Sequence, residues 1–308
     1  GIVDRPGDRK KHDHPVALLG GIGIFISFAV SILVYKRNDT QIITVLSVSF
    51  IVMLLGLIDD IFDIRALSKL LIEGCCALFI TVMGIRIDIF SHILGSKQIC
   101  SIFDILISSI WIIGVANAIN IIDGLDGLCA GISVISASAF AFISLVQSNN
   151  SALSILLPLI GSVFAFLLYN FYPANIFMGD SGSLFIGFVL GSASIMTVDI
   201  NNNAASLLVP VIILAVPIFD TGISILRRAF NKQKVMEADS RHIHYEMIAS
   251  GFAYRSTVIT IYGMSAAASV LSVIIYMSSN FMLALAAIIL LVILGFIIGI
   301  KWYKADRS

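Results

Sequence analysis

The feature that most constrains this chain is a series of apolar stretches, each long enough to cross a lipid bilayer. A transmembrane helix needs about 20 mostly apolar residues, and the apolar share of 58% exceeds that of soluble domains. The sequence therefore predicts an all-α fold, a polytopic integral membrane helical bundle in which residues 1–308 form a single membrane-embedded domain. About ten transmembrane helices are predicted, near residues 16–35, 41–58, 68–84, 102–121, 128–147, 152–170, 182–198, 205–226, 256–278 and 281–301.

The basic residues between these stretches predict the orientation of the chain. If residues 1–15 are cytoplasmic, 15 of the 19 lysines and arginines fall on the cytoplasmic side and the other four face outward. Positive charge accumulates in cytoplasmic loops of membrane proteins, so both chain ends are expected inside. The net charge of zero gives no reason to expect a nucleic-acid partner.

Three loops on the predicted cytoplasmic side concentrate aspartates where apolar stretches end. The first contains Asp59, Asp60 and Asp63, and three or four residues of helix would bring two of these carboxylates together. A carboxylate at a membrane boundary is costly unless it is paired, hydrated or metal-bound, and hard oxygen ligands suit Mg²⁺. Helix capping by an aspartate is the structural alternative. Together the loops predict a site for a divalent cation and a phosphorylated ligand.

The second loop is the block 117–127, and the third is the segment 177–183. Asn117, Asn120, Asp123 and Asp126 recur every three residues, which predicts one continuous polar stripe if the block is helical. Hydrogen bonds to neighbouring helices are the alternative, but they would not require two carboxylates. In 177–183, glycine, serine and helix-start amides are natural phosphate contacts, and capping explains Asp180 equally well.

The long cytoplasmic loop 227–255 contains Arg241, His242 and His244. These side chains are suited to binding a diphosphate, with the histidines as proton donors. A basic loop that touches anionic lipid is the alternative, and it applies equally to the basic run around Lys10. Because the two histidines are two residues apart, they are expected to point to different sides and to do different jobs.

These blocks, in this order, resemble the polyprenyl-phosphate N-acetylhexosamine-1-phosphate transferase family, most closely its bacterial undecaprenyl-phosphate N-acetylglucosaminyl-1-phosphate transferase branch. The resemblance covers nearly the whole chain and starts at Val3-Asp4-x-Pro6-x-x-Arg9-Lys10-x-His12. Members of the family usually have one more helix before this opening motif, so the resemblance implies eleven helices in an intact protein and the expectation that this chain lacks the N-terminal one. Members of this branch commonly read His-Ile-His-His, whereas Tyr245 takes the last place, so a role for a third histidine does not carry over.

The resemblance implies a Mg²⁺-dependent phosphotransferase, with Mn²⁺ as the alternative ion. It would transfer a sugar 1-phosphate, first of all N-acetylglucosamine 1-phosphate, from a UDP-sugar donor to undecaprenyl phosphate and release UMP. This is the first membrane step of a cell-envelope polysaccharide such as O-antigen. By resemblance, the metal ligands are Asn120 and Asp180, the catalytic residues are Asp59, Asp60, Asp123, His242 and His244, and the substrate-binding residues are Lys10, Asn117, Asp126, Phe177 and Arg241.

Other functions remain open from the residues. Related enzymes use UDP-sugars of the N-acetylfucosamine, N-acetylquinovosamine or muramoyl-pentapeptide type. A cation-coupled transporter is the alternative from another class, because carboxylates within the membrane also mark ion pathways. Transport predicts that Glu73 and Asp220 matter most, whereas transfer predicts Asp60, Asp123 and Asp180. The expected setting is the bacterial inner membrane, with the active site on its cytoplasmic face and a homodimer as a further expected assembly.

Overall fold

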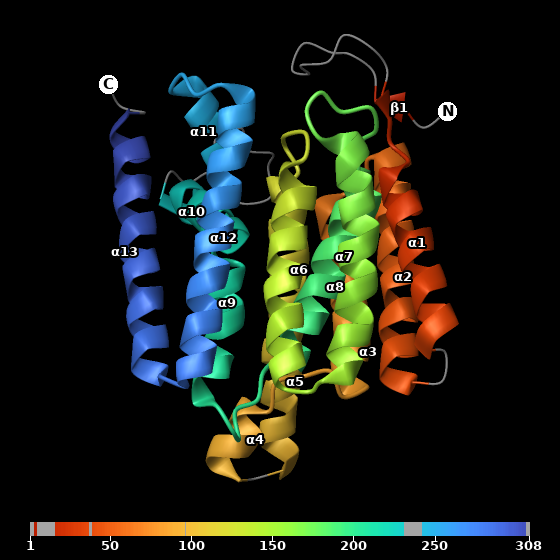
Figure 1. The fold of residues 1–308 in the computed structure, drawn as a ribbon, viewed down its shortest axis with the longest axis vertical. Helices are drawn as coiled ribbons and strands as arrows, with labels where there is room; N and C mark the ends of the chain where they lie inside the picture. The colour runs from red at the N-terminus through yellow and green to blue at the C-terminus, as the bar shows by residue number, and fades with distance from the viewer. Residues whose placement is uncertain (1–2, 5–15, 37–38, 96, 231–241, 306–308) are drawn as a thin grey trace. The chain divides into compact units, whose positions relative to one another are not determined.

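The computed structural model describes residues 3–4, 16–36, 39–95, 97–230 and 242–305, and nearly all of them are helical. Six helices in this part of the chain are long and apolar enough to cross a membrane. The predicted all-α polytopic fold is therefore confirmed. The chain separates into two compact units, residues 1–197 and 198–308 (Figure 1), while the assignment of one functional domain stays a prediction.

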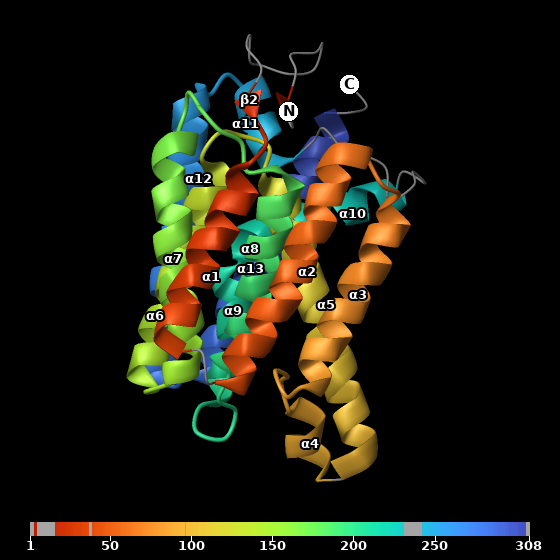
Figure 2. The same cartoon turned by 90° about the vertical axis from the view of Figure 1, so that its right-hand side faces the viewer.

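The first unit contains two short strands and eight helices among its described residues. These are β1 (Val3–Asp4), β2 (Val16–Ala17), α1 (Gly20–Lys36), α2 (Thr40–Phe62), α3 (Ala66–Val82), α4 (Ile89–Leu94), α5 (Lys97–Ile122), α6 (Leu128–Val146), α7 (Asn150–Asn170) and α8 (Gly179–Met196). Figure 2 shows α1, α2 and α3 side by side, with α4 beyond the end of α3 and packed against α5.

Helix α8 is the core of this unit. It packs against α1, α2, α5, α6 and α7, and every side chain from Ser181 to Ile195 is buried. Gly187 and Gly191 lie on its contact with α5, where a Cβ added at Gly187 would come within 2.7 Å of the Ala116 Cα. Small residues let helices approach closely in membranes, so this spacing explains how α8 fits inside the bundle.

The N-terminus of α8 is wedged between α1 and α2. A Cβ added at Gly21 would lie 2.3 Å from the Gly182 nitrogen, and one at Gly56 would lie 2.4 Å from the Asp180 carbonyl oxygen. The Gly21 nitrogen also donates to the Met178 oxygen at 3.0 Å. The start of α8 thus lies in close backbone contact with both α1 and α2.

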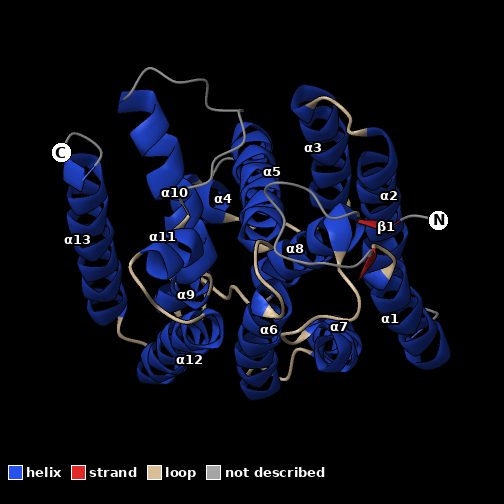
Figure 3. Ribbon diagram, turned by 90° about the horizontal axis from the view of Figure 1, so that it is seen from above, coloured by secondary structure: helices blue, strands red, loops and turns tan. Residues whose placement is uncertain are grey.

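The two strands hold the segment that leads into α8. They pair antiparallel, with Val3 opposite Ala17, and Ala17 also forms a parallel bridge with Ile176. The Phe177 nitrogen donates to the Ala17 oxygen at 3.0 Å. Figure 3 shows the strands beside the loop that enters α8.

The expected spans agree with the helices in most places. Six correspond to the long apolar helices, and two more, over 16–35 and 281–301, contain the shorter apolar helices Gly20–Tyr35 and Phe281–Leu294. The span expected at 68–84 is α3, a helix of 17 residues that carries Lys69 and Glu73. These two charged side chains lie in the candidate site described below.

The second unit contains η1 (Ala204–Leu207), α9 (Val209–Ile213), α10 (Ala215–Phe230), α11 (Ile243–Ala249), α12 (Tyr254–Ser278) and α13 (Phe281–Ala305). The prediction of one continuous helix over 205–226 is wrong, because this stretch is divided among η1, α9 and α10. Pro217 has no N–H to donate to the Ile213 carbonyl four residues earlier, and α9 ends at that residue. Within this unit, α9 packs against α12, and α10 packs against α12 and α13.

Candidate active site

One lysine joins two of the three acidic loops. After α2, Asp63 adopts a left-handed conformation with φ of 49° and reverses the chain, so that the first turns of α3 return Lys69 to the end of α2. Lys69 Nζ donates to Asp59 Oδ2 at 2.7 Å and also to Asp180 Oδ2 at the start of α8. The Ile64 nitrogen donates to the other oxygen of Asp59 at 2.9 Å. A single ammonium group therefore neutralises carboxylates from two helices.

Asp60 caps helix α8. Its Oδ1 accepts a hydrogen bond from the Asp180 nitrogen at 2.8 Å, and its Oδ2 accepts one from the Ser181 nitrogen at 3.1 Å. The first amides of a helix have no partner within the helix and attract negative charge. The expectation that the amides of 177–183 contact a phosphate is therefore corrected for these two groups, which already bind a carboxylate of the chain itself.

The two predicted metal ligands lie together. Asn120 Nδ2, in the last turns of α5, donates to Ser183 Oγ on α8 at 2.9 Å. The Asn120 side chain also hydrogen-bonds the Asp180 carboxylate. Helices α5 and α8 thus bring a carboxamide and a carboxylate together at Asp180, whose backbone nitrogen is capped by Asp60.

The chemistry of this donor set fits a magnesium ion. Mg²⁺ prefers oxygen ligands, keeps several of its waters and is bound by one or two carboxylates together with substrate phosphates. Asp59, Asp180 and Asn120 supply two carboxylates and a carboxamide. Among the residues that the structure describes, no group of three or more His, Cys, Asp or Glu side chains could hold a metal ion. The Lys69 ammonium lies between the two carboxylates, where such an ion would bind.

Asp123 lies in the turn after α5. The stripe predicted over 117–126 does not continue as helix, because α5 ends one residue before Asp123, whose nitrogen contacts the Asn120 oxygen at 3.2 Å. Burial, together with the charges of Asp180, Asp60 and Asp126, raises the pKa of Asp123 to about 7. A carboxyl group with this pKa can hold or release a proton near neutral pH.

Asp126 and Phe177 shape the loop that enters α8. Asp126 Oδ2 accepts a hydrogen bond from the Ala174 nitrogen at 2.9 Å. The buried Asn170 carboxamide crosses the same region, accepting from the Gly127 nitrogen and donating to the Ile176 oxygen, both at 2.9 Å. Asp126 therefore joins the turn after α5 to the loop that Phe177 ends.

Asn117 pairs with a buried acid. Its Nδ2 donates to Glu73 Oε2 at 2.6 Å and to the Ile113 carbonyl oxygen at 3.0 Å. Glu73 is completely buried, and its Oε1 has no hydrogen-bond partner. Asn117, expected to bind substrate, is thus engaged with an acid for which the sequence showed no local partner.

The two histidines belong to the second unit. His242 Nδ1 lies 2.9 Å from Asp220 Oδ2, whereas His244 is fully buried and neither of its ring nitrogens has a partner. The expectation that their side chains point to different sides is wrong, because the rings stack with centroids 5.8 Å apart and planes 10° from parallel. His242 is the extended N-cap residue of α11, so helical or strand spacing does not apply across the pair. Arg241 and Lys10 lie outside the described residues.

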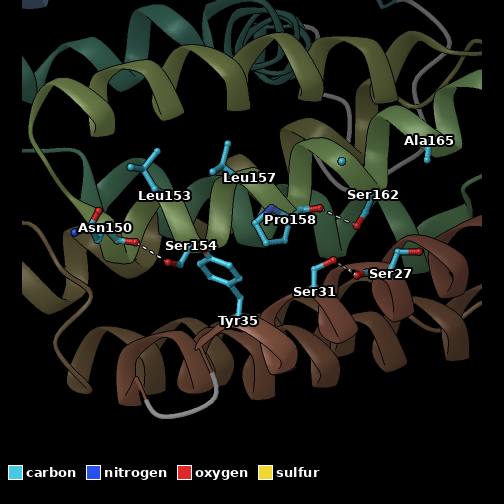
Figure 4. Close-up of a pocket in the computed structure, with 11 residues that line it drawn as sticks. Ser27, Ser31, Tyr35, Asn150, Leu153, Ser154, Leu157, Pro158, Ser162 and Ala165 are labelled. Atoms are coloured by element: carbon cyan, nitrogen blue, oxygen red, sulfur yellow. Dashed lines mark hydrogen bonds between the residues drawn. The ribbon is translucent and has the colours of Figure 1, made fainter.

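A separate groove runs between α1 and α7 in the first unit. It has a volume of about 740 Å³ and is lined by Ser27, Ser31, Tyr35, Asn150, Leu153, Ser154, Leu157, Pro158, Gly161, Ser162 and Ala165 (Figure 4). The hydroxyl groups of Ser31 and Ser154 donate to carbonyls of their own helices. None of the predicted site residues lines this groove, so it is distinct from the acidic cluster.

Comparison with known proteins shows the family to which the chain belongs. The sequence model of the family described as Glycosyl transferase family 4 matches residues 42–198, just over half of the 308 residues. The chain belongs to glycosyl transferase family 4. The family resemblance drawn from the motifs is thereby confirmed. The matched segment contains Asp59, Asn120 and Asp180, whereas His242 and His244 lie outside it.

Proteins with similar sequences come from several bacteria. The chain is 39% identical to "Probable undecaprenyl-phosphate N-acetylglucosaminyl 1-phosphate transferase" of Bacillus subtilis (strain 168), with 95% of this chain and 82% of that protein aligned. It is 31% identical to the "Undecaprenyl-phosphate alpha-N-acetylglucosaminyl 1-phosphate transferase" of Thermotoga maritima, over 79% of this chain and 72% of the relative. The protein of the same name from Escherichia coli (strain K12) is 26% identical, with 85% of this chain and 73% of that protein aligned.

Two residues of this site, Lys69 and Asn170, were not predicted from the sequence. Lys69 entered only as one positive charge among fifteen, although its place ten residues after Asp59, beyond a turn, was a usable signal. Asn170 received no role, and the sequence near it contains no motif that marks it. The structure brings the predicted Asp59, Asp60, Asn120, Asp123 and Asp180 to one end of the first unit.

Proposed function

We propose that this chain transfers N-acetylglucosamine 1-phosphate from a UDP-sugar to undecaprenyl phosphate and releases UMP. The observation that carries the proposal is the contact of Lys69 with both Asp59 and Asp180, since it shows two carboxylates converging on one cation. The names of the relatives from Bacillus subtilis and Thermotoga maritima support the choice of sugar and acceptor.

The reaction joins two anions. An oxygen of the acceptor phosphate attacks the phosphorus that bears the sugar, and the bond from that phosphorus to the UMP oxygen breaks. The product is a lipid-linked sugar diphosphate, and UMP leaves with the electron pair of the broken bond. The acceptor is a phosphate monoester with a second pKa of about 6, so its attack requires little assistance from a base. Positioning and charge neutralisation do most of the work in phosphoryl transfer.

The residues of the first unit are suited to these two tasks. Asp180 and Asn120, with Asp59 beside them, would hold Mg²⁺, which neutralises charge on a diphosphate and on a leaving phosphate. Asp60 fixes the start of α8 through two backbone amides, so that Asp180 stays in place. Asp126 and Asn170 hold the loop before α8, and Phe177 at the end of this loop would contact the uridine of the donor.

The test is transfer by the purified chain reconstituted in vesicles that contain undecaprenyl phosphate. Radiolabelled UDP-sugars of the N-acetylglucosamine, N-acetylgalactosamine and N-acetylquinovosamine types are offered in parallel, and label in the lipid fraction is counted. We expect N-acetylglucosamine to be transferred with release of UMP. Transfer of none of the sugars would overturn the proposal, and preference for another sugar would overturn the choice of donor.

Asp180→Ala tests the site within the same assay. The variant should abolish transfer at every Mg²⁺ concentration while the protein elutes as a folded species in detergent. Asp63→Asn is the matched control, because Asp63 is exposed and lies in the turn beyond the cluster. Near-normal transfer by Asp180→Ala would remove this residue from the site.

The proposed location is the cytoplasmic face of the bacterial inner membrane, supported by the fifteen-to-four distribution of basic residues. Of the four native cysteines, only Cys75 is exposed, so Cys75→Ser removes the native thiol that would react with the reagent. In that background, a cysteine introduced by Ser240→Cys should react with an impermeant thiol reagent only after cells are opened. One introduced by Asn202→Cys should react in intact spheroplasts. The reverse pattern would place the site outside.

A further inference from the structure

Lys69 occupies the centre of the acidic cluster. Its ammonium group contacts Asp59 Oδ2 at 2.7 Å and Asp180 Oδ2, and its side chain is only 14% exposed. Without a cation between them, these two carboxylates would repel each other at a partly buried position. In the state described by the structure, the lysine therefore supplies the charge that holds Asp59 and Asp180 together.

A second partner for this lysine lies one helical turn further along α3. Glu73 follows Lys69 by four residues, and side chains at this spacing share one face of a helix. Glu73 is completely buried, Asn117 occupies its Oε2, and its Oε1 has no partner. A buried carboxylate oxygen without a partner is unfavourable. The positive charge of Lys69 also acts on Glu73.

We propose that Lys69 is a tethered counter-ion that moves between two acidic sites. Without metal it bridges Asp59 and Asp180, and when a divalent cation binds these carboxylates it turns to the free oxygen of Glu73. The proposal rests on the metal site of the proposed function and adds roles for Lys69 and Glu73, which position the metal ligands without binding the metal.

The exchange follows from charge balance. A divalent cation and the ammonium group cannot share the space between Asp59 and Asp180, because like charges at contact distance repel strongly in a partly buried site. Glu73 provides a carboxylate for the displaced ammonium group without moving the backbone of α3. Cation entry therefore replaces one ion pair with another, and the ligands are already gathered when the metal arrives.

Binding of Mn²⁺ to the full chain in detergent, without substrate, tests the exchange. The fraction of free Mn²⁺ is measured by electron paramagnetic resonance for the unchanged chain, Lys69→Met, Glu73→Gln and the double variant. Lys69→Met should bind Mn²⁺ about tenfold more tightly, because the competing cation is gone, and a coupling of this size is typical between linked sites. Glu73→Gln should weaken Mn²⁺ binding several-fold when Lys69 is present.

The double variant separates the exchange from simple electrostatics. If Glu73 acts by receiving Lys69, Glu73→Gln should change Mn²⁺ affinity in the unchanged chain but not in the Lys69→Met background. If Glu73 acts only as one more negative charge, it should weaken binding equally in both backgrounds, and the proposal is overturned. Unchanged or weaker binding by Lys69→Met overturns it as well.

Labelling gives a readout that does not depend on a lysine variant folding. An amine-reactive reagent is applied with and without Mn²⁺, and modification of Lys69 is measured by mass spectrometry. In the unchanged chain Lys69 should stay protected in both conditions, because it is always paired. In Glu73→Gln, Mn²⁺ should make Lys69 reactive. Continued protection in that variant, at a Mn²⁺ concentration that fills the site, would overturn the exchange.

The transfer assay distinguishes this proposal from the proposed function. Non-additive Mn²⁺ binding in a chain that transfers no sugar would support the exchange and refute the function. Transfer of N-acetylglucosamine 1-phosphate with additive Mn²⁺ binding would support the proposed function and overturn the exchange.

Discussion

Asp220 holds His242 and the start of its helix with the two oxygens of one carboxylate. Oδ2 lies 2.9 Å from His242 Nδ1, and Oδ1 accepts a hydrogen bond from the Ile243 nitrogen at 2.8 Å. Both Asp220 and His242 are buried. When Nδ1 carries the hydrogen, the carboxylate fixes the ring orientation and leaves Nε2 as the acceptor.

The first prediction follows from this pair. Asp220→Asn should lower kcat/KM at least about tenfold, equivalent to about 1.4 kcal/mol, because the neutral amide no longer selects one state of the imidazole. Steady-state transfer kinetics of the two proteins measure the effect. Thr221→Val is the control, since the Thr221 hydroxyl is buried without a partner and its loss should leave the kinetics unchanged. Equal kcat/KM for Asp220→Asn and the unchanged chain would limit Asp220 to a structural role.

The second prediction concerns pH and stability. Burial lowers the pKa of the His244 imidazole to about 4, from an ordinary value of about 6.5. Between these values the unfolded chain binds a proton that the folded protein excludes, so stability should fall as pH falls from 6.5 to 4, by on the order of 3 kcal/mol. Thermal unfolding in detergent should show a smaller decline for His244→Phe, which cannot titrate. Parallel curves for the two proteins would contradict the assignment.

The third prediction separates two aspartates of the first acidic loop. Asp60→Ala removes the cap from α8 and should cost about 1–2 kcal/mol of stability, with transfer reduced because Asp180 loses its fixed position. Asp60→Asn keeps an acceptor oxygen and should cost less. Asp63→Asn, a change three residues away at a position that tolerates a left-handed conformation, should be nearly neutral. Thermal unfolding and transfer rates, measured on the same preparations, test the order of these effects.

The fourth prediction uses two glycines of the same helix. Gly21→Ala places a Cβ 2.3 Å from the Gly182 nitrogen, so α1 and α8 must separate, at a cost of about 1–3 kcal/mol. In Gly23→Ala the added Cβ meets nothing within 4 Å, and alanine favours helix over glycine by about 0.5–1 kcal/mol. Unfolding temperatures should therefore move in opposite directions. A stable and fully active Gly21→Ala would show that this contact relaxes without consequence.

Hydropathy predicted most helices because the bilayer permits few structures other than helices whose backbone groups pair internally. It failed at 205–226, where the stretch as a whole is apolar enough for a span but Pro217 interrupts the hydrogen bonding. Pro217 is evident in the sequence, but whether it interrupts a helix depends on where the preceding helix ends. Local pattern therefore predicted the spans better than it predicted their continuity.

The sequence predicted most residues of the candidate site but not the contacts between them. Spacing identified Asp59, Asn120 and Asp180 as polar groups at helix ends, because charge is rare in such a chain. It did not reveal that Lys69 bridges two of them or that Asp60 caps α8, since these contacts join segments more than 100 residues apart in the sequence. Such pairings depend on helix packing, which apolar periodicity leaves undefined.

The wedge at the start of α8 also bears on how members of this family can be recombined. Gly21, Gly56 and Asp60 fit the first turn of α8 as one set, because a side chain at either glycine or the loss of the carboxylate disturbs the same backbone. A chimera that takes α8 from one relative and α1 and α2 from another should therefore assemble only when both parents share these three residues. The smallest part that can be exchanged between such proteins is therefore the first turn of α8 together with Gly21, Gly56 and Asp60, rather than any single motif.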